Sequence, residues 1–205
     1  MKKTILTTVT ISLILSGCGY VGYDPAAGHV KQSPFTNEDY HPGTIINGYT
    51  LPPEPDHEEN DKTVAGIDVN GNGIRDDVER YIIIKESSPK AQYPQTWTAV
   101  MLQYARGYQE LLVEKRAQKY NDAESCIHHI GLLLEQKNGY YYVPAVHRDL
   151  EYALMTNTEK RESAWLEGCP GNPGSCGGNF KYRENPLKGI HLYCEADISA
   201  IGELF

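Results

Sequence analysis

The chain has 205 residues, of which 27 are acidic and 19 are Lys or Arg, and its formal net charge is −8. An acidic surface repels nucleic-acid phosphates and anionic lipid headgroups, so this balance argues against both as partners of the folded part. It is compatible with cations or with a basic protein partner. The length suits one domain of ordinary size together with a tether.

The first 17 residues have the pattern of an export signal. Lys2 and Lys3 form a short cationic start, and an apolar stretch follows over residues 4–15. This stretch is shorter than the roughly 20 residues that a membrane-spanning helix needs. It has the length of a signal-peptide core, so we expect residues 1–17 to be removed from the mature protein.

The signal ends with Leu15, Ser16, Gly17 and Cys18. This sequence resembles the lipobox of bacterial lipoproteins, in which a small residue precedes an acylated cysteine. The resemblance implies cleavage after Gly17 and lipid attachment at Cys18, whose acyl chains would give a stable membrane anchor. Gly19 stands where an inner-membrane retention signal has Asp, which implies the outer membrane, facing the periplasm or the surface. The alternative interpretation of Cys18 is a buried core cysteine.

Removal of the signal would leave 188 residues with a net charge of −10. Residues 18–60 contain six prolines, many glycines and no sustained apolar period, which is typical of an extended tether. Within this lipid-anchored tether, we expect residues 47–55 to lie against the domain, because Tyr49 and Leu51 alternate. Residues 61–205 are then the folded domain.

The domain has mainly helical patterns. Apolar residues recur at helical spacing in four segments, which predicts helices over residues 76–87, 94–120, 122–138 and 146–167. Residues 140–144 are predicted to be extended, and residues 190–205 fit a strand or a short helix. We therefore expect a mainly α fold: a small bundle of about four helices with an extended N-terminal tether. Residues 168–189 form a Gly/Pro-rich, disulfide-bearing C-terminal loop region.

Four cysteines remain once Cys18 is assigned to lipid, namely Cys126, Cys169, Cys176 and Cys194. Export to an oxidising compartment predicts two disulfides, with three pairings open. Cys169 and Cys176 flank a turn-rich loop, which favours pairing between them and leaves Cys126 to pair with Cys194. The alternative is a zinc site, because histidines lie near Cys126 and Cys194, although the spacing lacks a Cys-x2-Cys pair.

Residues 68–79, DVNGNGIRDDVE, match every position of the calcium-loop pattern D-x-[DN]-x-[DN]-G-x5-E. Calcium prefers six to eight oxygen ligands, and short side chains at alternate positions of a tight loop supply them from one side. We expect ligands from the side chains of Asp68, Asn70, Asn72, Asp76 and Glu79, and from the carbonyl of Ile74. The alternative is an Asn/Gly turn that precedes a helix N-terminus.

This loop resembles that of the EF-hand, and more closely the solitary loops of exported bacterial domains. Residues 61–67 are too short and Gly-interrupted to form the entering helix of a full EF-hand, and no second loop is present. A sensor that opens a groove is therefore not expected. Three carboxylates among the ligands suggest weak affinity, about 10⁻⁴–10⁻³ M. We expect the ion to be structural, pinning the tether to the first helix.

The sequence has no motif of a nucleophile elbow, a zinc protease or a phosphate-binding glycine loop. His128 and His129 are adjacent, so at most one of them faces inward from a helix. His147 is expected near a helix N-terminus, where its charged form is disfavoured. We therefore expect a protein that is not an enzyme.

The function that these features suggest is an outer-membrane-anchored, calcium-binding lipoprotein that acts as a non-enzymatic protein-binding module. A lipobox followed by a compact domain resembles immunity lipoproteins, which neutralise toxins that reach the periplasm. One alternative is a structural or assembly lipoprotein of the cell envelope. Another is a small hydrolase whose site is assembled from distant residues.

Overall fold

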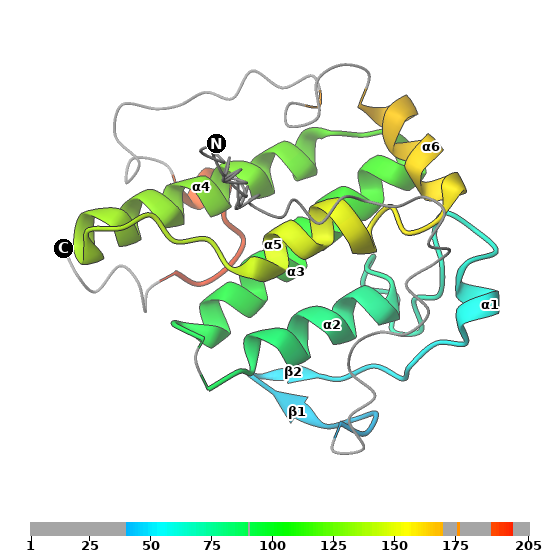
Figure 1. Cartoon of the computed structure of the whole chain (residues 1–205), viewed down its shortest axis with the longest axis horizontal. Coiled ribbons are helices and arrows are strands. Elements are labelled where there is room, and N and C mark those ends of the chain that lie inside the picture. The colour runs from blue at the N-terminus through cyan, green and yellow to red at the C-terminus, as the bar shows by residue number, and fades with distance from the viewer. Residues whose placement is uncertain (1–39, 90, 170–175, 177–189, 199–205) are drawn as a thin grey trace, which may run out of the picture.

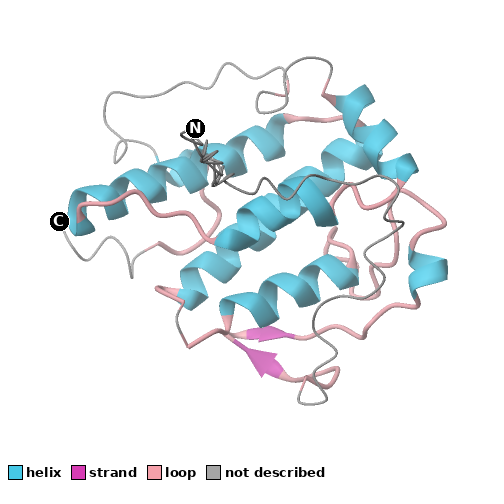
Figure 2. Cartoon of the chain, viewed as in Figure 1, coloured by secondary structure: helices cyan, strands magenta, loops and turns pink. Residues whose placement is uncertain are grey.

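The computed structural model describes residues 40–89, 91–169, 176 and 190–198. This part of the chain is mainly helical, as the sequence predicts (Figures 1 and 2). Its elements are the strands β1 (Ile45–Ile46) and β2 (Tyr49–Thr50), the helices α1 (His57–Asn60), α2 (Asp76–Glu86), α3 (Pro94–Glu114), α4 (Gln118–Asn138), α5 (Ala145–Asp149) and α6 (Glu159–Gly168), the π-helix η1 (Leu150–Leu154) and the 3-10 helix η2 (Ile190–Leu192).

Helix α3 is the centre of the molecule, with α2 and α4 packed against it (Figure 1). The apolar stripe that the sequence predicts on this helix is buried in full, because Trp97, Tyr104 and Leu111 are each 0% exposed. The two long helices approach closely at Gly107, where a Cβ atom would lie 2.7 Å from the backbone of Lys119. Glycine at this crossing therefore allows the backbones of α3 and α4 to touch.

The helix predicted over residues 94–120 is wrong at its C-terminal end. The helix stops at Glu114 because Lys115 takes a left-handed backbone conformation, with φ of 59°, and its N–H donates to the Leu111 carbonyl. The chain reverses there and α4 begins at Gln118. The sequence has no glycine or proline at this point, so the apolar pattern continues across the turn without a visible stop.

The single helix predicted over residues 146–167 is also wrong. The structure has α5, η1 and α6 in its place, with a break after Leu154. Thr158 ends the break, because its side-chain hydroxyl accepts a hydrogen bond from the Arg161 N–H and so caps α6. Thr and Asn favour such cap positions over helix interiors, since their side chains compete for backbone hydrogen bonds.

The described end of the predicted tether, residues 40–60, packs on the helices. Asn47 and Gly48 both have positive φ and make the two-residue turn of the β1–β2 hairpin. Leu51 is 1% exposed and joins a small apolar cluster on α2. Arg80 of α2 holds this segment further, because its guanidinium donates to the carbonyls of residues 40 and 52 and pairs with Glu54.

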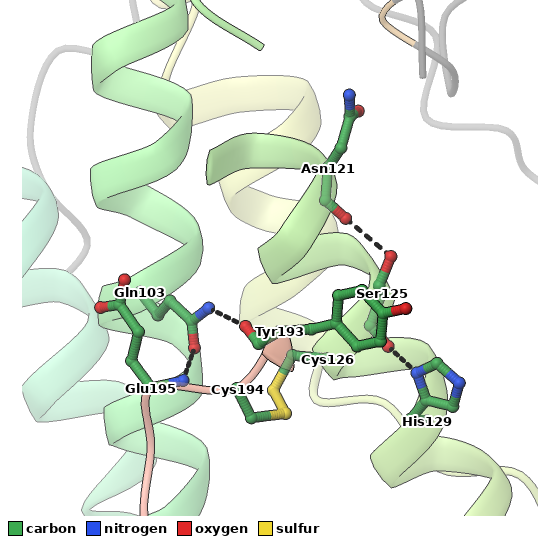
Figure 3. The surroundings of a disulfide bond; sticks show 8 residues. All are labelled: Gln103, Asn121, Ser125, Cys126, His129, Tyr193, Cys194 and Glu195. Carbon is green, nitrogen blue, oxygen red and sulfur yellow. Dashed lines mark hydrogen bonds between the residues drawn. A yellow bond between two sulfur atoms is a disulfide. The ribbon is translucent and has the colours of Figure 1, made fainter. Parts of the chain in front are cut away.

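Both disulfides join the pairs of cysteines that the sequence favours. Cys126 bonds to Cys194, with an S–S distance of 2.05 Å, and Cys169 bonds to Cys176. Figure 3 shows how the first bond joins α4 to the C-terminal segment, where Gln103 of α3 also donates to the Tyr193 carbonyl. All four thiols are oxidised, so they are not available as zinc ligands. Residues 199–205 of the predicted tail lie outside the described residues.

Candidate calcium site

Asp68 organises the candidate loop. One oxygen of its carboxylate accepts hydrogen bonds from the N–H groups of Gly71 and Asn72, at 2.8 and 3.2 Å. The other accepts one from Gly73 at 2.8 Å. Gly71 and Gly73 have φ of 68° and 84°, which favour glycine. The Asp68 carboxylate therefore holds residues 68–73 in a tight turn.

The two asparagines continue the same winding. The side-chain oxygen of Asn70 accepts from the Asn72 N–H, and that of Asn72 accepts from the Ile74 N–H. The Asn70 amide nitrogen also donates to the Glu79 carboxylate at 2.9 Å. The side-chain oxygens of both asparagines thus bind N–H groups of the loop itself, and the Asn70 amide nitrogen joins the loop to the helix residue predicted to close the site.

Asp76 and Glu79 extend from the first turn of α2 and are 0% and 4% exposed. Burial raises the pKa of Asp76, and the negative charges of Asp68 and Asp77 raise it further. A hydrogen bond from the Val69 N–H lowers this pKa but does not outweigh the burial. Burial likewise raises the pKa of Glu79, with Asp76 and Asp68 adding to the effect. Carboxylates that disfavour one another's charge in this way are a group that a divalent cation would relieve.

Of the predicted ligands, Asn70 is hydrogen-bonded to Glu79, and Asp68 and Asp76 each accept backbone N–H groups of the loop. The side chain of Ile74 is buried, at 1% exposure. In the described residues, no three His, Cys, Asp or Glu side chains are placed so as to hold a metal ion together. A calcium site here would therefore need a mixed set of ligands, including amide and carbonyl oxygens of the loop, because the three predicted carboxylates are not gathered around one point. Such a set is one that calcium accepts.

Cys18 lies outside the described residues, and its acylation stays a prediction.

The sequence reasoning gave no role to two residues beside the site, Arg75 and Asp77. The Arg75 side chain is fully buried, and its guanidinium pairs with both oxygens of Asp77 at 2.9 and 3.0 Å. Although burial by itself raises the pKa of Asp77, the charge of Arg75 outweighs it and lowers that pKa. Arg75 also donates to the Leu154 carbonyl at 2.9 Å, so the loop is tied to the segment before α6.

A cleft of about 430 Å³ lies between the loop and α3. Arg106 spans it, because its guanidinium donates to the Asn72 carbonyl at 3.1 Å and pairs with Glu195. On the α4 side of the cleft, Glu110 is paired with Arg116 and Lys119. The cleft therefore carries cations that already have acidic partners.

The histidines are held in structural contacts. His129 faces inward at 5% exposure and His128 does not, in agreement with the prediction that at most one would. His147 lies near the N-terminus of α5 as expected, but the expectation that its charged form is disfavoured is wrong, because Glu124 of α4 lies 3.1 Å from its ring. Although burial lowers the pKa of His147, the hydrogen bond and charge of Glu124 outweigh it, so that pKa is raised.

Comparison with known proteins assigns no family. No protein-family model matches the chain, and no curated protein or solved structure matches it either. Among the described residues, no helix is both long and apolar enough to cross a membrane.

Proposed function

We propose that this chain is a calcium-binding domain of an exported lipoprotein, in which the ion is a structural part of the fold. The observation that supports it best is the winding of residues 68–74 around the Asp68 carboxylate, with Asp76 and Glu79 buried beside it. Asp76 accepts the Val69 N–H and Glu79 accepts the Asn70 amide, so the donors of these hydrogen bonds are uncharged. Both carboxylates lie inside, where a cation would offset their cost of burial.

Calcium binding is tested by equilibrium dialysis of the purified protein. One ion should bind per chain, with a dissociation constant of about 10⁻⁴–10⁻³ M. Asp68→Ala should remove binding, and Glu58→Gln, an exposed change on α1, should leave it intact. Magnesium should compete poorly, because it requires a nearly octahedral site. Absence of saturable binding up to about ten times that range would contradict the proposal.

We propose that the anchor is a lipid at Cys18, and that it holds the protein at the outer membrane, facing the periplasm. The support is the sequence before this cysteine, a short apolar core that ends in Leu15, Ser16 and Gly17. Metabolic labelling with palmitate should mark the protein, and Cys18→Ser should abolish the label. A label that persists in the variant would exclude this anchor.

We further propose that the domain binds a protein, with an immunity or inhibitor role against a periplasmic toxin as the particular form. The supporting feature is a run of rings on the α4 side. Tyr141 contacts His128, His128 contacts His129, and His129 stacks on Tyr193. Tyr141 is 43% exposed, and tyrosine is enriched at protein interfaces.

A further inference from the structure

Residues 61–65 connect α1 to the calcium loop and form no helix or strand. Although residues 62, 63 and 65 are exposed, several carbonyls of this segment and of Asn60 are bound by side chains from distant elements. The Arg161 guanidinium of α6, about 100 positions further along the chain, donates to the carbonyls of Asn60, Thr63 and Val64, at 2.5, 3.2 and 3.3 Å. Lys160 of α6 donates to the Lys62 carbonyl, and Gln109 of α3 donates to the Ala65 carbonyl at 2.8 Å. Figure 1 shows α1 and α6 at the same end of the molecule.

Every N–H group of the Arg161 guanidinium donates a hydrogen bond within the protein. Its remaining two bonds go to the side-chain oxygens of Asp61 and Asn157, both at 2.7 Å. Together with the three carbonyls, these partners take all five N–H donors of an arginine. Arg161 is 0% exposed, so no water competes for them. A lysine has three donors on one atom and cannot reproduce this fork.

The anchored segment leads directly into the loop. Asn60, held by Arg161 through its carbonyl, uses its side-chain oxygen to accept the Ile67 N–H at 2.9 Å, one residue before Asp68. Gly66 lies between, with φ of 68°, and a Cβ atom there would come within 2.5 Å of the Arg75 side chain. The contacts of Arg161 thus extend, through Asn60 and Ile67, to within one residue of Asp68.

We propose that Arg161 is the positioning residue of the calcium loop. Its guanidinium orders the residues before Asp68, as an entering helix would if this loop had one. In an EF-hand a helix precedes the loop and fixes its first ligand. Here α1 ends at Asn60, and the guanidinium orders the residues between α1 and Asp68 instead. The effect on calcium affinity rests on the proposed function, whereas the ordering of the loop does not.

The test uses hydrogen exchange of the metal-free full-length protein, followed by calcium binding. In Arg161→Lys, amides of residues 66–75 should exchange at least threefold faster, and calcium affinity should fall at least fivefold. Arg116→Lys is the matched control, because Arg116 is exposed and also lines the cleft beside the loop. Leu134→Ala, in the core on α4, lowers stability without touching these contacts. Both controls should leave exchange of the loop unchanged.

Asn157→Ala keeps the experiment decisive if Arg161→Lys does not fold, since it removes one partner of the guanidinium. It should shift loop exchange and affinity in the same direction by a smaller factor. Loop exchange equal to that of the unaltered protein in the folded variants would overturn the proposal, as would an equal effect of Leu134→Ala. If the unaltered protein binds no calcium, the proposed function fails, and the exchange measurement still decides the role of Arg161.

Discussion

At the residue scale, this protein buries several charged side chains, and each is stabilised by a different set of hydrogen-bond or ion-pair partners. Arg75 and Arg161 are fully buried and bind carbonyls and carboxylates. Asp77 is matched by Arg75, so its loss would leave a buried cation unpaired, which typically costs several kcal/mol. The carboxylates of Asp76 and Glu79 instead accept hydrogen bonds from uncharged donors, the Val69 N–H and the Asn70 amide.

Glu86, at the C-terminal end of α2, provides a test of burial alone. The residue is 3% exposed, and burial raises the pKa of Glu86 to about 7, with Lys85 opposing weakly. The pKa of Glu86 is therefore higher in the folded protein than its value of about 4.5 in the unfolded chain. The contribution of this carboxyl group to stability is complete below pH 4.5, and it is lost as the pH rises through about 7, where the buried group becomes charged.

We therefore expect Glu86→Gln to increase the free energy of unfolding at pH 8 by about 2 kcal/mol, because glutamine has no charge to bury. At pH 4, below the unfolded pKa, the variant and the unaltered protein should be nearly equal. Urea denaturation at the two pH values measures this difference, with Glu135→Gln, exposed on α4, as the control. A gain of the same size at both pH values would contradict the argument.

At the element scale, sequence patterns predicted the buried helix face and failed at helix ends that have no glycine or proline to mark them. The apolar stripe from Trp97 to Leu111 forms one buried helix face, as its spacing predicts. The ends of α3 and α6 were not predicted, because the reversal at Lys115 carries no glycine or proline and the break before Thr158 lies within a helical pattern. The turn at Asn47 had a usable signal, since Asn-Gly between apolar residues is typical of a hairpin.

The two disulfides should differ in their contribution to stability, because they close loops of different length. Cys126 and Cys194 are separated by 68 positions, and Cys169 and Cys176 by seven. The loop-closure model gives about 4 kcal/mol for the long loop and about 2.5 kcal/mol for the short one. Replacing each pair with serine and measuring denaturation should show the larger loss for Cys126 and Cys194. Equal losses, or the reverse order, would mean that loop entropy does not dominate.

At the scale of the whole molecule, the candidate loop joins parts that are far apart in the sequence. The side chains of the loop were predictable because the twelve residues form a local motif with fixed spacing. Their supports were not, because Arg75 reaches the Leu154 carbonyl and Arg161 reaches residues 60–64 only after the chain has folded. No spacing rule in the sequence links residues that are 79 or more positions apart.

The most direct test of the calcium site is thermal unfolding of the full-length protein in calcium and in chelator. At ten times the dissociation constant, linkage adds about 1.4 kcal/mol, which corresponds to about 4 °C in a domain of this size. Glu79→Gln, which keeps the shape of the side chain, should remove this gain. Asp77→Asn should lower both curves and keep the gain between them. Identical curves with calcium and with chelator would show that residues 68–79 are an ordinary turn.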